Sequence, residues 1–116
     1  MAASQPSGLS NLQRDHLIPL SEAVRMTAQF RAKNPEGVRA WLFDRRAIDA
    51  LLAQKGCAGI RVYRGVGTDG SDHVLLVGTD ESGTDLGAAK IDGGGLVAEI
   101  GWPCPPICGG SSVMEG

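Results

Sequence analysis

The sequence predicts an α+β protein, with two N-terminal helices packed on an antiparallel meander of three to four strands and a C-terminal tail rich in Pro, Cys and Gly. Three observations lead to this fold class. Apolar side chains recur at helical spacing between residues 21 and 55. From residue 59 onward the period changes to two, which is typical of half-buried strands. Glycine is abundant, with 17 residues in 116, and it alternates with aspartate in the later turns.

The first helix is expected to run from Ser21, a good N-cap, to about Lys33. Glu22 then lies at the positive end of the helix dipole. The segment Asn34–Gly37 contains a proline and ends the helix. Its helical-period positions are Ala23, Val24, Thr27 and Phe30.

The second helix is expected to begin after Asp44, which is a favourable N-cap. Phe43, just before the cap, can pack on Ile48 one turn later. Gly56 is expected to take the left-handed conformation that ends a helix, which would bury the Cys57 side chain against Leu52. The apolar stripe of this helix consists of Ala47, Ile48, Leu51 and Leu52.

The β part begins with Gly59–Arg64, where apolar and polar side chains alternate as in a half-buried strand. The continuous apolar run Val74–Val77 indicates a central strand that is covered on both faces. Weaker strand signals follow at Leu86–Ile91 and Leu96–Ile100, and the turns between these segments are rich in Gly and Asp.

These elements predict three regions: a flexible arm over residues 1–16, a single α+β domain over 17–101 and the tail over 102–116. No apolar run reaches the roughly 18 residues of a membrane span, so we expect no membrane partner. The N-terminal residues lack the basic and then apolar pattern of a secretory signal, and we therefore expect a cytoplasmic protein.

The charge is unevenly distributed along the chain. The net charge is −2, but residues 14–64 hold ten Lys or Arg against five acids, while residues 65–116 hold Lys90 against eight acids. We expect the basic helices to lie beside acidic turns in one fold. A nucleic-acid partner is not favoured, because the overall balance is acidic even though Arg39, Arg45 and Arg46 are close in sequence.

The tail carries the most unusual pattern of the chain. Proline restricts its conformation, so this apolar segment is extended and loses little entropy when it docks into a groove of its own domain or of another chain. The predicted partner-binding residues are Trp102, Pro103, Pro105, Pro106 and Ile107. We therefore expect a non-enzymatic protein that acts by self-association or by binding a protein partner, with no catalytic residue assigned.

A zinc site is the first alternative, because cysteine and histidine are the ligands that zinc favours. The candidate ligands are Cys57, Cys104, Cys108 and His73. An extended polyproline segment would hold the Cα atoms of Cys104 and Cys108 roughly 12 Å apart. That separation is too large for a shared metal or a disulfide, unless a turn or a cis proline closes the gap.

Thiol redox chemistry is the second alternative, in which a bridge from Cys57 to Cys104 or Cys108 would attach the tail to the domain. Cys57 follows a helix C-terminus, where the dipole does not stabilise a thiolate, and we expect its thiol to be inert. The hypothesis that the protein is a small enzyme with its active site at an oligomer interface is the least favoured. His16 and His73 have no catalytic motif around them.

Three stretches together resemble a group of small bacterial proteins that have no established activity. They are Leu20–Thr27 with Phe30-Arg31, then Ile48–Tyr63 (IDALLAQKGCAGIRVY), then Cys104–Cys108 (CPPIC). The shared features are the first helix, an "LL-Q-GC-GIR-Y" junction between helix and strand, and a CP-rich cysteine tail. The resemblance implies a bacterial origin and makes the three cysteines part of a family pattern, but it implies no function.

Overall fold

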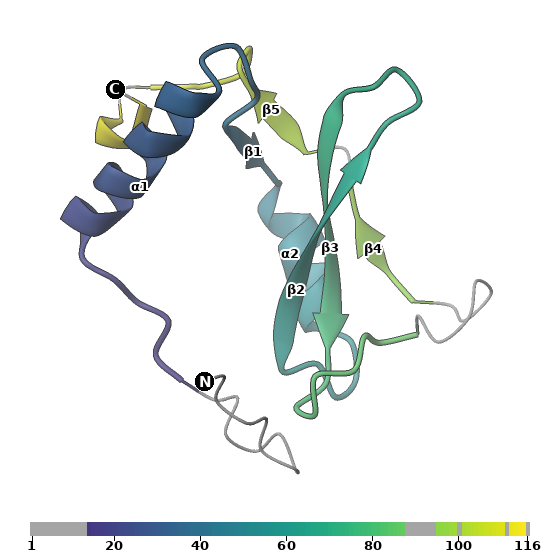
Figure 1. The fold of residues 1–116 in the computed structure, drawn as a ribbon. Helices are drawn as coiled ribbons and strands as arrows, with labels where there is room; N and C mark the ends of the chain where they lie inside the picture. The colour runs from purple at the N-terminus through teal and green to yellow at the C-terminus, as the bar shows by residue number, and fades with distance from the viewer. Residues whose placement is uncertain (1–13, 88–94, 100, 111, 116) are drawn as a thin grey trace, which may run out of the picture. The chain divides into compact units, whose positions relative to one another are not determined.

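The computed structural model describes residues 14–87, 95–99, 101–110 and 112–115. The chain divides into two compact units, and their elements can be followed in Figure 1. The first unit comprises the described residues within Phe43–Gly101. The second unit joins Asp15–Leu42 with Trp102–Gly116, so the tail belongs with the N-terminal helix.

The sheet of the first unit consists of β2 (Gly59–Val66), β3 (Asp72–Thr79) and β4 (Val97–Ala98) in the order β2-β3-β4, and both pairings are antiparallel. The β2–β3 register runs from Gly59 opposite Thr79 to Val66 opposite Asp72. The prediction that the apolar run Val74–Val77 forms a central strand is confirmed. The strands extend beyond the predicted limits, because hairpin pairing continues through glycine and polar residues.

Helix α2 (Arg45–Leu52) packs on this sheet and contacts all three strands. Its predicted cap is confirmed, since the Asp44 side chain accepts a hydrogen bond of 2.7 Å from the backbone N–H of Arg46. Leu51 is 2% exposed and forms the buried core of this unit with Leu76 and Val77.

The predicted end of α2 is wrong by one turn. The helix ends at Leu52 and is followed by a turn, in which Gly56 takes the expected positive φ of 80°. Leu52 is half exposed, and the Cys57 side chain is half buried and not fully buried as expected. Gly56 therefore takes its left-handed conformation in the turn that follows α2, and not at the position directly after the helix.

The second unit contains α1 (Leu20–Lys33), β1 (Ala40–Leu42), β5 (Trp102–Cys104) and the short 3-10 helix η2 (Val113–Glu115). Strands β1 and β5 form a two-stranded antiparallel sheet, with Trp41 opposite Pro103. Helix α1 contacts η2, and the Arg31 guanidinium donates a hydrogen bond to the backbone carbonyl of Met114.

The prediction that both helices pack on one meander is wrong, because α1 belongs to the unit that contains β1 and β5. Helix α1 begins at Leu20 after Pro19, without a side-chain cap, and not after Ser21. None of its residues, all of them described, is buried. Helical periodicity identifies the apolar side of a helix, but it does not specify which element will cover that side.

Other predictions fall partly outside the described residues. Leu86 and Gly87 lie in a turn and not in a strand, and residues 88–91 of that predicted strand are not described. Most of the predicted arm over residues 1–16 is likewise outside the described ranges. Within those ranges, no helix combines the length and the apolar character that crossing a membrane requires.

Candidate functional site

The segment Trp102–Cys108, here called the tail loop, is fixed to β1 by backbone pairing. Cys104 lies opposite Ala40 and Trp102 opposite Leu42. The Arg39 N–H donates to the Cys104 carbonyl at 2.7 Å, and the Ile107 N–H donates to the Pro103 carbonyl at 2.8 Å. The tail is thus docked on its own chain, as an edge strand followed by a closed turn.

A disulfide between Cys104 and Cys108 closes the tail loop, with 4.7 Å between the two Cα atoms. The peptide bonds Cys104–Pro105 and Pro105–Pro106 are both cis. The sequence had left open whether a cis proline brings the two cysteines together, and here the chain is not an extended polyproline helix. The predicted bridge from Cys57 to a tail cysteine is absent, because Cys57 is a free thiol.

The predicted partner-binding residues differ in exposure. Trp102 is 53% exposed and Ile107 is 46% exposed. Leu42, which pairs with Trp102 across the sheet, is 61% exposed. Pro105 and Pro106 are exposed, whereas Pro103 is half buried. The tail loop and the end of β1 therefore present adjoining apolar side chains at the surface.

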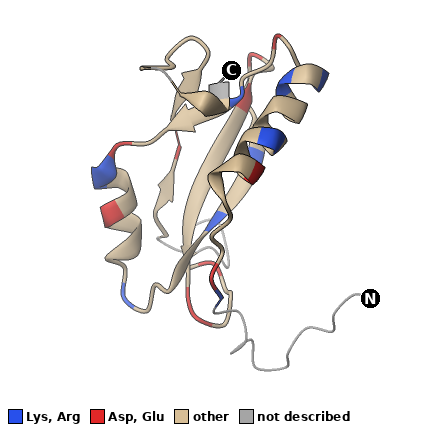
Figure 2. Cartoon of the chain, turned by 90° about the vertical axis from the view of Figure 1, so that its left-hand side faces the viewer, with Lys and Arg blue, Asp and Glu red and all other residues tan. Residues whose placement is uncertain are grey.

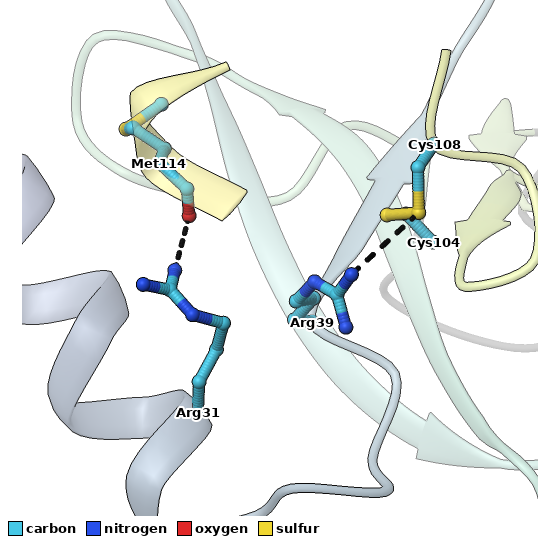
Figure 3. The surroundings of a disulfide bond; sticks show 5 residues. All are labelled: Arg31, Arg39, Cys104, Cys108 and Met114. Carbon is cyan, nitrogen blue, oxygen red and sulfur yellow. Dashed lines mark hydrogen bonds between the residues drawn. A yellow bond between two sulfur atoms is a disulfide. The ribbon is translucent and has the colours of Figure 1, made fainter. Parts of the chain in front are cut away.

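Arg39 is a residue of this site that sequence reasoning did not assign to it. Its side chain points toward the disulfide, and its Nη2 lies 3.9 Å from Cys108 Sγ (Figure 3). The guanidinium is partly buried, and its Nε has no hydrogen-bond partner among the described residues. The contact joins residues 69 apart in sequence, so no local pattern could have indicated it.

The other two predicted zinc ligands lie in the first unit. Cys57 Sγ is 3.4 Å from the Gly59 carbonyl and is close to Gly78 on β3. His73 is five positions away on the same strand, or about 17 Å at the rise of a β-strand. The described residues include no group of three or more His, Cys, Asp or Glu placed to hold a metal. A zinc site remains a prediction, which native mass spectrometry of the reduced protein can test.

His73 belongs to a hydrogen-bonded chain of side chains at the β2–β3 turn. Its Nδ1 lies 2.7 Å from Glu99 Oε1, and its Nε2 lies 2.9 Å from Ser71 Oγ. Ser71 Oγ in turn donates to Asp69 Oδ1 at 2.6 Å, and this bond is the main cause that lowers the pKa of Asp69. Serine, histidine and glutamate stand here in the order of a catalytic relay. The Ser71 hydroxyl donates to Asp69, however, and not to His73 as a serine nucleophile of such a relay would. The hydrogen bonds link the β2–β3 turn to Glu99, which follows β4.

A second polar cluster surrounds Asp85. Arg61 Nη1 donates to Asp85 Oδ1 at 2.6 Å, and the Tyr63 hydroxyl donates to the other carboxylate oxygen. The hydrogen bond to Asp85 is the largest cause of the raised pKa of Tyr63. In the sequence, Asp85 stands out only as one of several aspartates in the turns between the predicted strands. Asp85 pairs with Thr79 at the end of β3. Its side chain accepts hydrogen bonds from Arg61 and Tyr63 on the neighbouring strand β2.

Comparisons of the chain with protein-family models, with curated proteins and with solved structures found no match.

Proposed function

We propose that the protein acts by self-association, and that the tail loop and β1 form the contact surface between two copies. The observation that carries this proposal is the distribution of apolar side chains in the second unit. Among its described residues, Cys104 is the one buried hydrophobic side chain, at 3% exposure. The exposed ones include Leu20, Met26, Phe30, Leu42, Trp102, Ile107 and Val113.

Such a unit gains little stability from its own core. Chains of about 40 residues or fewer usually need disulfides, metals or oligomerisation in order to fold. The Cys104–Cys108 bridge spans a sequence separation of only four. In the chain-entropy model so short a loop contributes about 2 kcal/mol. Burial of the exposed apolar side chains against another surface would supply the missing stabilisation, at about 25 cal/mol per Å².

A second copy of the chain suits this surface better than a strongly charged partner. The contact residues Leu42, Trp102 and Ile107 are uncharged, and tryptophan is the side chain most enriched at the energetic centres of interfaces. The net charge of the whole chain is only −2, so two copies repel each other weakly. Both helices carry charges of each sign, with one acidic residue in each, as Figure 2 shows.

Sedimentation velocity of the full chain over a wide range of concentrations tests this proposal. We expect the wild type to shift from monomer to a defined oligomer as concentration rises. The double variant Trp102→Ser with Ile107→Ser should raise the dissociation constant about tenfold or more, because two central apolar contacts are lost.

Val66→Ser is the matched control, because Val66 is 73% exposed but lies in the first unit. It should associate like the wild type. A wild-type protein that stays monomeric at every concentration would contradict the proposal. Equal weakening by Val66→Ser and by the double variant would show that the tail loop is not the contact surface.

A further inference from the structure

The two cysteines of the tail loop have different surroundings. Cys104 is 3% exposed and lies within the β1–β5 pairing, whereas Cys108 is half buried in the turn that follows. The Arg39 guanidinium approaches Cys108, with Nη2 at 3.9 Å from its sulfur, as Figure 3 shows. When the bridge is reduced, this arrangement gives one accessible thiol beside a cation and one buried thiol behind it.

The charge of Arg39 is not neutralised by a carboxylate among the described residues. The ion pairs found there join Arg25, Arg45, Arg46, Arg61 and His73 to acidic side chains. Arg39 instead has a partly buried guanidinium that points at sulfur, and its Nε has no hydrogen-bond partner within the described ranges. A cation held beside a thiol favours the thiolate, which is the nucleophile in thiol chemistry.

We propose that Cys104 and Cys108 form a thiol–disulfide exchange site, in which Cys108 attacks an accessible disulfide of the substrate, Cys104 resolves the intermediate, and Arg39 stabilises the attacking thiolate. This inference does not rest on self-association. The two Cα atoms are 4.7 Å apart in the bridged loop, and pairing with β1 fixes the backbone of Cys104, so the resolving sulfur starts close to its target.

The reaction balances without a further reactant. The Cys108 thiolate bonds to one sulfur of the substrate disulfide, whose S–S bond breaks, and the released substrate thiolate takes a proton from water. Cys104 then gives its proton to solvent, and its sulfur bonds to Cys108 Sγ as the second substrate thiolate leaves. The protein dithiol is oxidised to the disulfide, and the substrate disulfide is reduced to its thiols. In the reverse direction the protein disulfide oxidises a substrate dithiol.

Alkylation of the reduced full-length chain by iodoacetamide, a neutral probe, tests the assignment of the nucleophile. Peptide mapping should show that Cys108 reacts before Cys104 and before Cys57. Cys57 is a useful internal control, because it is also half buried but its sulfur faces the Gly59 carbonyl and not a cation.

Arg39→Gln should slow alkylation of Cys108 about tenfold at neutral pH and move its pH profile to higher pH, since an opposite charge at this distance shifts a pKa by a unit or more. Arg31→Gln is the matched control, because Arg31 lies in the same unit and donates to the Met114 carbonyl. Arg39→Lys should retain most of the rate. Circular dichroism of each variant shows whether it is folded.

The resolving step is tested with 2-hydroxyethyl disulfide, another neutral probe, on dilute reduced protein. The wild type should release two thiols per chain and finish with the intramolecular bridge, whereas Cys104→Ser should stop at a mixed disulfide on Cys108. The proposal is overturned if Cys57 or Cys104 reacts first, or if folded Arg39→Gln reacts as fast as Arg31→Gln. It is also overturned if the wild type stops at the mixed disulfide. All of these reactions are run on dilute protein, so that association through the tail loop does not cover Cys108.

Discussion

At the scale of single residues, Gly78 shows how closely α2 approaches the sheet. A Cβ atom there would lie 2.8 Å from Gln54 Oε1, 3.0 Å from Cys57 Sγ and 3.3 Å from the Leu51 carbonyl oxygen. The backbone oxygen cannot move without displacing the helix. Gly78→Ala should therefore lower the free energy of unfolding by about 1–3 kcal/mol, as measured by urea denaturation.

Gly110→Ala is the control for this substitution, because a Cβ at Gly110 meets nothing within 4 Å. It should change stability by less than about 0.5 kcal/mol. If Gly78→Ala is equally neutral, then α2 does not pack on β3 as described.

Residue roles that depend on local rules were predictable from the sequence. The Asp44 cap and the positive φ of Gly56 follow from the residue type and its immediate neighbours. Arg39 beside Cys108 and Glu99 beside His73 were not predictable, because each contact joins segments that are far apart in the chain. Polar residues in loops carry no periodicity that reveals such partners.

At the scale of elements, the turn that follows β3 is organised by one carboxylate oxygen. Asp80 Oδ1 accepts from the Ser82 N–H at 2.9 Å, from Ser82 Oγ at 2.7 Å and from the Thr84 N–H at 2.9 Å. The hydrogen bond from Ser82 Oγ is the largest cause that lowers the pKa of Asp80 below its ordinary value of 3.8. This turn also places Asp85 where its carboxylate accepts a hydrogen bond from Arg61.

Because the folded pKa is depressed, ionised Asp80 contributes stability that is fully present above about pH 5 and is lost as pH falls through the folded pKa. Asp80→Asn keeps the Oδ1 acceptor but cannot titrate. Its free energy of unfolding should therefore fall less steeply than that of the wild type between about pH 5 and pH 2, in urea titrations at several pH values. Glu81→Gln changes a neighbouring acid that takes no part in these bonds, and it should keep the wild-type slope. An unchanged slope in Asp80→Asn would contradict this role.

Element prediction succeeded where the pattern was long enough to have a period. The helices over 20–33 and 45–52 and the strands β2 and β3 span at least eight residues each. Strands β1 and β5 have three residues each, and their pairing joins residues 40–42 to 102–104. Three residues show no alternation, and Pro103 argues against a strand in isolation. For this reason the sequence did not reveal the sheet that positions the tail loop.

At the scale of the whole molecule, residues from the basic and the acidic parts of the sequence meet in an ion pair within the first unit. Arg61 on β2 belongs to the basic part of the sequence, and its partner Asp85 belongs to the acidic part. Hairpin pairing thus brings a basic strand residue and an acidic turn residue together within the first unit. The division of the chain has a different origin, namely the pairing of β1 with β5.

The division into two units predicts that a destabilising substitution in the core of one unit lowers amide protection mainly in that unit. Leu51, at 2% exposure, belongs to the first unit, and Leu51→Ala should lower the stability of that unit by about 2–5 kcal/mol. Hydrogen exchange should show the loss at β2 and β3 amides, while the Arg39 and Ile107 amides of the second unit keep their protection. Leu42→Ala, at a side chain that is 61% exposed, should leave the β2 and β3 amides unchanged. If Leu51→Ala reduces protection equally in both units, the chain unfolds as one cooperative body, and the tail loop depends on the core of the first unit.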